Sequence, residues 1–459
     1  MLKGTWLKSA IATATLAALM SASGEQPLNA QRQEPRLTDA QLLDKVQSQT
    51  LKYFTDFSHP ISGMARERTN GVEVYGKDIV TTGGTGFGIM AMIAGTEHGW
   101  LTRQQMLDRV TKIVNFLDTH AHTYHGAFPH YMDGMTGETF EWGRNDDGGD
   151  LVETSFLMMG LLSARQYFSG DNPEEAALRE KINRMWENVD WQFYTRGENR
   201  LYWNWSPNHQ WDIGLPIRGY NEAMVAYVLA ASSPTHPIGR AVYQNGWAGN
   251  GAIRNGTPFG DSRLLGPEPM GGPLFLSQYS FLGLDPNGLR DEFANYADQT
   301  RNHTLANRAY VIENPKRFDG YGEKSWGLTA SEGPHGYDVY SPTNDQGVIA
   351  PTAAISSLPY TPEYAMQALR HFYEDYDGRL WGRYGFVDAF NESAGWQSSE
   401  NLAIDQGPEV VMIENYRTGL LWNLFMSAPE VKQGLEKLGF QSPHLAQNFT
   451  PQQQPRPSF

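Results

Sequence analysis

Cysteine is absent from this chain of 459 residues, and basic residues are comparatively few. Without cysteine the chain can form neither a disulfide nor a thiol nucleophile, and its composition says nothing of its redox compartment. The 36 lysines and arginines are outnumbered by 51 acidic residues, which gives a net charge of −15. Because such an acidic surface repels phosphate backbones, we exclude nucleic acid as a partner.

Motifs for metals, cofactors and serine nucleophiles are also missing. No H-E-x-x-H or similar ligand spacing connects the histidines His125, His130, His209 and His335. The chain has no G-x-S-x-G motif, and the glycines of 83–99 lack the spacing of a dinucleotide-binding loop. We therefore expect no cofactor and no catalytic metal, although the acidic loop 145–150 leaves a structural calcium ion open.

The sequence has no apolar run long enough to span a bilayer, and a short apolar run lies near the N-terminus. Lys3 and Lys8 precede the apolar run 10–20, and small residues follow it at 21–23. This order predicts a secretory signal peptide over 1–23, because the run is too short to span a bilayer; an uncleaved interfacial helix is the alternative. We expect a linker over 24–36 and a periplasmic or secreted protein with no membrane contact after cleavage.

The sequence does contain a long series of helical patterns. Amphipathic, charged helices are predicted at 37–57, 102–120, 172–194 and 289–309. Between them lie shorter, more apolar helices, predicted at 83–99, 150–168, 221–231, 274–282, 321–330, 347–357 and 416–425, with two more at 362–376 and 429–438. Because apolar helices are buried and amphipathic ones cover them, the alternation predicts an all-α protein with two concentric layers, an (α/α) barrel.

Glycine and proline punctuate the links between these helices. The 47 glycines and 26 prolines predict long structured loops, which we expect at 195–220, 240–272 and 377–414, gathered at one end of the barrel. The polar segment 441–459 is expected to be a disordered tail.

Four acidic residues crowd into eight positions before one of the apolar helices: Asp146, Asp147, Asp150 and Glu153. Asp150 and Glu153 have the spacing of a capping box, and acids are favoured in a first turn by the helix dipole. This structural explanation does not account for Asp146 or for the glycine pair 148–149. We interpret the segment both as a helix start and as part of a site.

Five motifs occur in order along nearly the whole chain: Arg144–Thr154 (RNDDGGDLVET), Gly219–Ala223 (GYNEA), Ser233–Pro237 (SPTHP), Phe275–Ser280 (FLSQYS), and Ile404–Pro408 (IDQGP) followed by Ile413–Arg417 (IENYR). With these motifs the chain resembles the glucoamylase-like family of bacterial secreted proteins, glycoside hydrolase family 144, the β-1,2-glucan hydrolases. The resemblance implies an (α/α)6 barrel, assigned to 37–440, with long loops at one end. It also implies inverting hydrolysis of β-1,2-linked glucan.

Inverting hydrolysis requires an acid for the leaving oxygen and a base for water, with the two carboxyls about 6.5–9.5 Å apart. Asp150 and Glu153 alone are too close, because side chains three residues apart on a helix are separated by only about 5–6 Å. We therefore assign the general acid to Glu222 and the general base to Asp405, a pairing that rests partly on the resemblance. Asp146, Asp150 and Glu153 are assigned as supporting carboxylates on the substrate side.

These assignments have competing interpretations. Glu222 could be a helix-dipole acid beside an Asn221 cap, Asp405 could form a turn before Gly-Pro, and the base could instead be Asp146 or Asp150. Exo action, a different β-glucan specificity on the same barrel, or a non-catalytic carbohydrate-binding periplasmic protein are the alternative functions. The leading prediction is a monomeric, secreted hydrolase that acts on a β-linked glucan.

Aromatic residues make up 12% of the chain, which suits a large core or ring faces that stack on sugars. We expect contacts with the substrate from Trp142, Arg144, Trp203, Trp205, Trp326, Trp396, Tyr416 and Arg417. Packing within a loop is the alternative for each aromatic residue, and Arg417 could simply pair with Glu414.

The N-terminal pattern makes a direct prediction about export. N-terminal sequencing of the exported protein should begin between Gly24 and Gln31, because the small residues after the apolar run suit signal cleavage. Recovery of intact Met1 in the membrane fraction would contradict this prediction.

Overall fold

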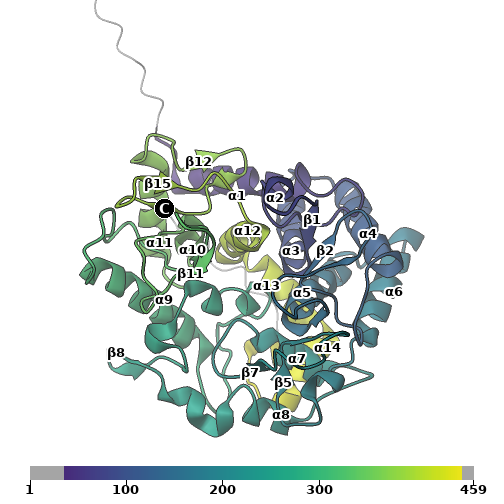
Figure 1. Cartoon of the computed structure of the whole chain (residues 1–459). Helices are drawn as coiled ribbons and strands as arrows, with labels where there is room; N and C mark the ends of the chain where they lie inside the picture. The colour runs from purple at the N-terminus through teal and green to yellow at the C-terminus, as the bar shows by residue number, and fades with distance from the viewer. Residues whose placement is uncertain (1–35, 447–459) are drawn as a thin grey trace, which may run out of the picture. The chain divides into compact units, whose positions relative to one another are not determined.

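The structure, a computed structural model, describes residues 36–446. The chain divides into two units, Met1–Thr38 and Asp39–Phe459, and the helices and strands of the described residues lie in the second (Figure 1). The predicted signal peptide over 1–23 and the predicted linker up to residue 35 lie outside the described residues.

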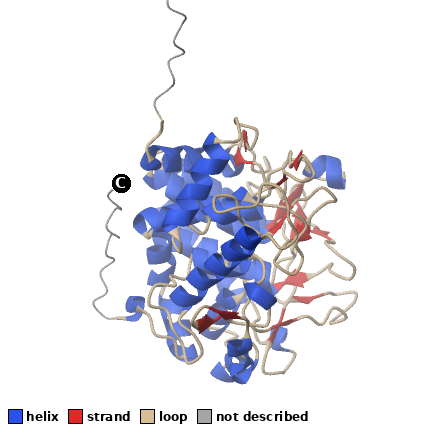
Figure 2. Ribbon diagram, turned by 90° about the vertical axis from the view of Figure 1, so that its left-hand side faces the viewer, coloured by secondary structure: helices blue, strands red, loops and turns tan. Residues whose placement is uncertain are grey.

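The second unit is mostly helical, as predicted. Figure 2 shows the helices on one side and most of the short strands and loops on the other. The α-helices are α1 (Asp39–Thr55), α2 (Gly71–Tyr75), α3 (Thr82–Glu97), α4 (Arg103–Thr119), α5 (Leu151–Tyr167), α6 (Pro173–Asn188), α7 (Met224–Ser232), α8 (Arg240–Asn245), α9 (Tyr296–Glu313), α10 (Pro351–Ile355), α11 (Pro362–Glu374), α12 (Ala403–Thr418), α13 (Leu420–Ser427) and α14 (Pro429–Leu438).

The strands are two or three residues long and pair antiparallel. They are β1 (Ile79–Thr81), β2 (Tyr131–Asp133), β3 (Thr139–Phe140), β4 (Gly149–Asp150), β5 (Leu201–Tyr202), β6 (Asn204–Trp205), β7 (Pro216–Ile217), β8 (Pro258–Phe259), β9 (Ser262–Arg263), β10 (Ala330–Ser331), β11 (Asp338–Val339), β12 (Trp381–Gly382), β13 (Gly385–Phe386), β14 (Phe390–Asn391) and β15 (Trp396–Gln397). β1, β2 and β3 form one sheet, and the pair β4–β6 sets Gly149 opposite Trp205 and Asp150 opposite Asn204.

The buried helices pack against one another in a defined order. α3 lies between α5 and α12, α5 also contacts α7, and α12 also contacts α10. The amphipathic α1 packs against both α3 and α12, and α11 packs against α10. The amphipathic α1 therefore lies against two of the apolar helices.

Two glycines allow α3 and α5 to approach closely. A Cβ atom at Gly86 would lie 2.2 Å from the carbonyl oxygen of Phe156, and one at Gly160 would lie 2.2 Å from that of Gly86. Any larger residue at either position would force the two helices apart, because the interior is close-packed. This contact explains why the apolar helix predicted at 83–99 is rich in glycine.

Several predicted helices differ from the structure. The segment 274–282 forms two 3-10 helices, η4 (Leu274–Ser277) and η5 (Ser280–Leu282). The segment 321–330 is not helical, and Gly327 within it has a φ of +133°, which no helix contains. The helix predicted at 416–425 is interrupted at Gly419, whose φ of +70° ends α12 before α13 begins.

The predicted link 377–414 contains most of α12, one of the buried helices. Gly407 and Pro408 favour a turn when taken alone, but both lie inside α12. A Cβ atom at Gly407 would lie 2.5 Å from Phe87 Cβ, so the glycine serves the contact with α3. Pro408 removes one hydrogen bond from the helix, and packing on both sides of α12 outweighs that loss.

The predicted disordered tail begins too early at residue 441. Gln441 exchanges backbone hydrogen bonds with Arg290, and His444 Nε2 lies 2.9 Å from Asp285 Oδ2. Residues 447–459 lie outside the described residues. Between residues 36 and 446, no helix is long and apolar enough to cross a membrane.

A buried carboxyl on α12 makes folding sensitive to pH. Glu409 is fully buried, and burial raises its pKa to about 8, although the hydroxyl of Thr50 donates to Oε2 at 2.7 Å. The folded pKa therefore exceeds the unfolded value of 4.5, and the folded state takes up a proton between these two values. The contribution of Glu409 to the free energy of unfolding is fully present below the unfolded pKa, and it is lost as pH rises through the folded pKa.

The Glu409→Gln variant should consequently gain stability relative to the parent chain as pH rises from about 5 to about 8, by on the order of 1 kcal/mol per pH unit. Chemical denaturation of both proteins across this range measures the difference. Parallel pH dependences of the free energy of unfolding would contradict the prediction.

Candidate active site

The acidic residues named from the sequence lie at the N-terminal ends of buried helices. Asp150 directly precedes α5, Glu153 lies in its first turn, and Asp405 lies in the first turn of α12. Glu222 lies two residues before Met224, the first residue of α7. Because the unpaired N–H groups of a helix start carry partial positive charge, these positions favour carboxylates.

Asp150 caps α5, as predicted, and holds two further side chains. Its Oδ1 accepts hydrogen bonds from the backbone N–H groups of Val152 and Glu153, each at 2.9 Å. Its Oδ2 lies 2.9 Å from Nδ1 of His130 and accepts from the indole N–H of Trp203 at 3.2 Å. A helix cap therefore also organises the residues around it.

Glu153 points away from its own helix start, so the reciprocal half of the predicted capping box is not formed. Its Oε2 accepts a hydrogen bond from the backbone N–H of Gly83 on α3 at 2.7 Å. A Cβ atom at Gly83 would lie only 2.5 Å from this oxygen, so glycine is required there. Burial raises the pKa of Glu153, the positive charge of His130 opposes this, and the charge of Asp150 raises the pKa further.

His130 is a cation between two carboxyl groups. Burial alone lowers the pKa of its imidazole, but Glu153, 4.0 Å from Nε2, and Asp150 outweigh burial and raise the pKa to about 9. Its ring stacks on the indole of Trp142 at a centroid distance of 5.7 Å. Trp142 is 40% exposed, so the stack extends from the buried acids to the surface.

The other two acids of the cluster have different surroundings. Asp146 accepts a hydrogen bond from Asn204 at 3.1 Å, and burial followed by the charge of Asp150 raises its pKa. Asp147 is held by the hydroxyl of Ser206. Among residues 36–446, no group of three or more His, Asp or Glu side chains is arranged to hold a metal ion.

Glu222 is partly exposed in the turn that leads into α7. The hydroxyl of Ser280 donates to its carbonyl oxygen and helps hold the turn. The side chain of Asn221 does not cap α7, whose N-cap residue is Ala223. Burial raises the pKa of the Glu222 carboxyl to about 7, with a further contribution from the charge of Glu153. A large fraction of the carboxyl is therefore protonated at neutral pH.

Asp405 lies on a buried helix rather than in the loop that the sequence predicted. Its side chain is 5% exposed, and its carboxyl lies within hydrogen-bonding reach of the carboxyl of Asp388, which is fully buried. Burial raises the pKa of Asp405 well above its ordinary value, and the closeness of Asp388 disfavours a second negative charge on the pair. The pair Asp388–Asp405 is the centre of a second acidic group.

The second acidic group also contains Glu67, Glu332 and Glu400, and Arg68 contacts all three. Its Nε lies 2.7 Å from Glu67, and its Nη1 lies 2.5 Å from Glu332 and 3.3 Å from Glu400. One guanidinium therefore contacts three carboxylates, and its own side chain is only 7% exposed.

Tyr279 connects the two acidic groups. Burial raises the pKa of its phenol, and the charges of Asp405, Glu222 and Glu153 raise it further. These three carboxyls, from three different helix starts, therefore lie near one side chain. Tyr131 also lies close to both groups, because the charges of Glu67 and Glu153 raise its pKa after burial does.

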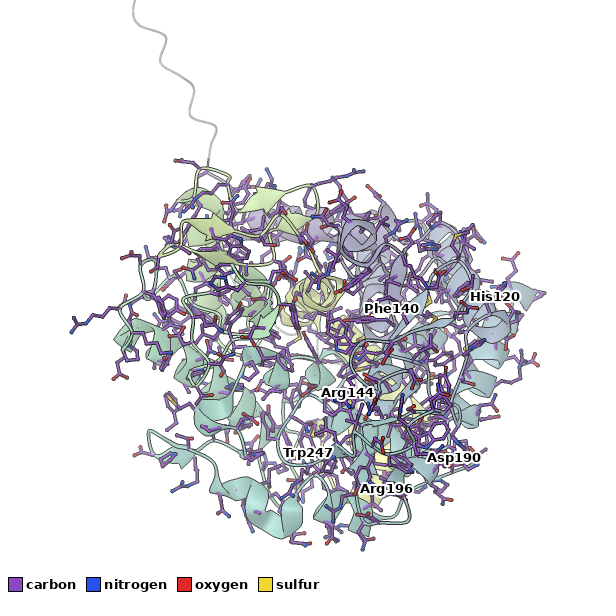
Figure 3. The ribbon with its side chains drawn as sticks, in the orientation of Figure 1. His120, Phe140, Arg144, Asp190, Arg196 and Trp247 are labelled. Atoms are coloured by element: carbon purple, nitrogen blue, oxygen red, sulfur yellow. The ribbon has the colours of Figure 1, made fainter. Side chains whose placement is uncertain are left out.

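Three of the predicted sugar-binding residues lie beside the first acidic group. Trp203 donates to Asp150, and Trp142 stacks on His130. Arg144 is exposed in the loop that connects Trp142 with the acids (Figure 3). These side chains are placed to contact a ligand that reaches the carboxyls.

Other predicted sugar-binding residues lie elsewhere. Trp326 is fully buried in the core and offers no face to a ligand. Tyr416 and Arg417 lie near the end of α12, roughly 16–18 Å along the helix axis from Asp405. Arg417 pairs with Asp44 at 2.7 Å rather than with Glu414. The structure therefore does not bring these three residues to the acids: Trp326 is enclosed by the core, and position along α12 separates Tyr416 and Arg417 from Asp405.

Two more tryptophans lie in short antiparallel pairs. Trp205 packs edge-on against Phe193 at 5.5 Å and against His125 at 5.0 Å, as the loop-packing alternative predicted. Trp396 is half-buried in the hairpin β14–β15, opposite Asn391. It makes no hydrogen bond or ring contact with the two acidic groups among the described residues.

Sequence reasoning missed several residues of the site: Glu67, Arg68, Gly83, His130, Glu332, Asp388 and Glu400. None of them lies in one of the motifs quoted above, and their partners are distant in sequence. Tyr279 does lie within such a motif, FLSQYS, so the sequence carries a signal that this residue belongs to the site.

The charge of Asp150 can be tested separately from its role as a cap. Asn is as good an N-cap residue as Asp, so Asp150→Asn should preserve α5 and lower the pKa of His130 from about 9. Asp150→Ala should lower that pKa as well and cost about 1 kcal/mol more in stability. Histidine titration by NMR and thermal unfolding measure the two effects; an unchanged His130 pKa in Asp150→Asn would contradict the assignment.

Known proteins are similar to this chain in sequence and in structure. A family model described as "Putative glucoamylase" matches residues 214–429. The exo β-1,2-glucooligosaccharide sophorohydrolase of Parabacteroides distasonis is 43% identical over 425 residues, which cover 88% of this chain and 58% of that protein. The chain thus spans little more than half the length of this curated relative.

Solved structures match over more of their length. The endo-β-1,2-glucanase of Chitinophaga pinensis, solved with sophorotriose and glucose, is 50% identical, with a TM-score of 0.86; the match covers 89% of this chain and all of that one. A β-1,2-glucanase of Parabacteroides distasonis is 42% identical, with a TM-score of 0.84, over 88% of this chain and 60% of that one. The chain therefore belongs to the glucoamylase-like family, glycoside hydrolase family 144.

Proposed function

We propose that the protein hydrolyses β-1,2-linked glucan with Glu222 as general acid and Asp405 as general base. The observation that carries the proposal is the position of Glu222 and Asp405, which come from different helix starts and both lie close enough to Tyr279 for their charges to raise its pKa. The names of the relatives supply the substrate class, since they act on β-1,2-glucan or its oligosaccharides.

The surroundings of Glu222 suit a general acid. A pKa of about 7 leaves much of the carboxyl protonated at neutral pH, yet the proton is not held too tightly to be given up. Glu222 would donate this proton to the glycosidic oxygen as the bond to the anomeric carbon breaks. Activity should therefore decline as pH rises through about 7, because the acid is then ionised.

Asp405 would accept a proton from the water that attacks the anomeric carbon. Because Glu222 precedes α7 and Asp405 lies on α12, their separation is not limited to the 5–6 Å or so of a helix pair. This leaves room for a water molecule between base and sugar, as inversion requires. Asp146, Asp150, Glu153 and the cationic His130 would hold sugar hydroxyls on the opposite side.

We also propose that the helices form an (α/α)6 barrel and that the exported protein acts as a monomer. The support for the barrel is the order of contacts among α3, α5, α7, α10 and α12, with amphipathic helices outside them. The long loops and short strands would then gather at the end where the acids lie.

Endo and exo action both have a named relative, and the products distinguish them. Linear β-1,2-glucan and sophoro-oligosaccharides should be incubated with the protein, and the products separated by chromatography. Sophorose as the sole early product would indicate exo action, and a ladder of longer oligosaccharides would indicate endo action. No hydrolysis of any β-glucan, with retained glucan binding, would favour the non-catalytic alternative.

Glu222→Gln and Asp405→Asn should each lower kcat by several orders of magnitude while the circular dichroism spectrum stays unchanged. Each variant keeps the shape of the side chain and removes the proton donor or acceptor. Glu153→Gln is the comparison, because it should act more through substrate binding. The initial product should be the α-anomer by NMR.

An initial β-anomer would overturn the inverting mechanism. Near-normal turnover of Asp405→Asn would leave inversion standing and move the base to Asp146 or Asp150.

A further inference from the structure

Asp388 and Asp405 each have an oxygen atom that receives no protein donor. Asp388 Oδ2 accepts from the backbone N–H of Glu332 at 2.7 Å, whereas Asp388 Oδ1 and Asp405 Oδ2 are buried without any partner from the described residues. The two carboxyls nevertheless lie within hydrogen-bonding reach of each other. Two carboxylates cannot donate, so a single proton between them satisfies both oxygens at once.

Among the described residues, no cation forms an ion pair with Asp388 or Asp405 that could replace this proton. Arg68 is engaged by Glu67, Glu332 and Glu400 at 2.5–3.3 Å, and no ion pair joins it to either aspartate among the described residues. The titratable and charged groups near the pair are Tyr53, Glu67, Arg68, Tyr279, Glu332, Tyr337 and Tyr340, together with Glu400, whose carbonyl oxygen accepts from the backbone N–H of Asp388. Acids exceed cations in this set, which disfavours two negative charges on the pair.

We propose that Asp388 is a positioning residue that carries the shared proton when Asp405 acts as the base. Protonated Asp388 donates to Asp405 Oδ2, which lets a buried Asp405 be the anion and leaves its Oδ1 to face the attacking water. The proposal rests on the function proposed above and adds to it a residue that shares no helix with the other acids.

Each proton released in this step is taken up by a named group. The water O–H bond breaks, its oxygen bonds to the anomeric carbon, and its proton moves to Asp405, so the pair becomes neutral. The glycosidic C–O bond breaks at the same time, and Glu222 gives its proton to the leaving oxygen. After product release, one proton passes from the pair to solvent and one returns from solvent to Glu222.

Two substitutions separate this role from a purely structural one. In Asp388→Asn the amide oxygen can accept from Glu332 N–H and the amide nitrogen can donate to Asp405, as the protonated acid does. Asp388→Ala removes the donor. Because loss of a donor to the charged form raises a carboxyl pKa, the acidic limb of kcat/KM should move upward by at least one pH unit in Asp388→Ala.

The expected kinetics follow the same order. Asp388→Asn should lower kcat less than about ten-fold, and Asp388→Ala should lower it more than about a hundred-fold near pH 6, with KM changed less than about three-fold in both. Loss of activity in Asp388→Asn as large as in Asp405→Asn would overturn the proposal, because Asp388 would then itself be needed as an anion. Equal losses in both variants with an unshifted acidic limb would also overturn it.

A second experiment measures thermal unfolding and needs no substrate. It can therefore show that this proposal fails even where the proposed function holds. Burial raises the pKa of both carboxyls above the ordinary value of an aspartate, so the folded pair holds a proton that the unfolded chain has released, and this contribution to stability is lost as pH rises. Asp388→Asn has no such ionisation, and its Tm should fall less than that of the parent chain between about pH 6 and 9. Parallel Tm profiles would overturn proton sharing even if the enzyme hydrolyses β-1,2-glucan as proposed.

Discussion

Buried carboxyl groups must be stabilised by donors, cations or protons, and this requirement shapes the whole active-site end of the molecule. Among the described residues, Arg68 and His130 are the cations in contact with the site acids. They are too few for the carboxyls around them, so helix N-termini and shared protons supply the rest. Asp150 uses the start of α5, and Glu153 uses a backbone N–H of α3.

The same shortage of positive charge separates the chemical roles of the acids. Glu222 has no cation partner among the described residues and keeps its proton to about pH 7, which suits a proton donor. Asp405 lies against a second carboxyl, so that the pair retains one proton and one negative charge. Asp150 instead contacts a cationic histidine and two backbone N–H groups, which suits a carboxylate that orients neighbours.

Close helix packing brings these groups together. Gly86, Gly160 and Gly407 let α3 approach α5 and α12 at distances that no side chain would allow. The starts of α3, α5 and α12 then lie side by side, and Gly83 can reach the carboxylate of Glu153. Replacing these glycines would act on the site through the positions of the helix starts rather than through chemistry.

The sequence by itself determined the helical class, the burial of the glycine-rich helices, the cap at Asp150 and the family. These depend on local periodicity, capping chemistry and contiguous motifs, which are visible along the chain. Only the tertiary structure decided that Asp405 lies on a helix, that Arg417 lies far from the site, and that Asp388 and His130 belong to it. The physical reason is that the charge state of a buried acid depends on neighbours brought by other helices, and those neighbours leave no pattern near it in the sequence.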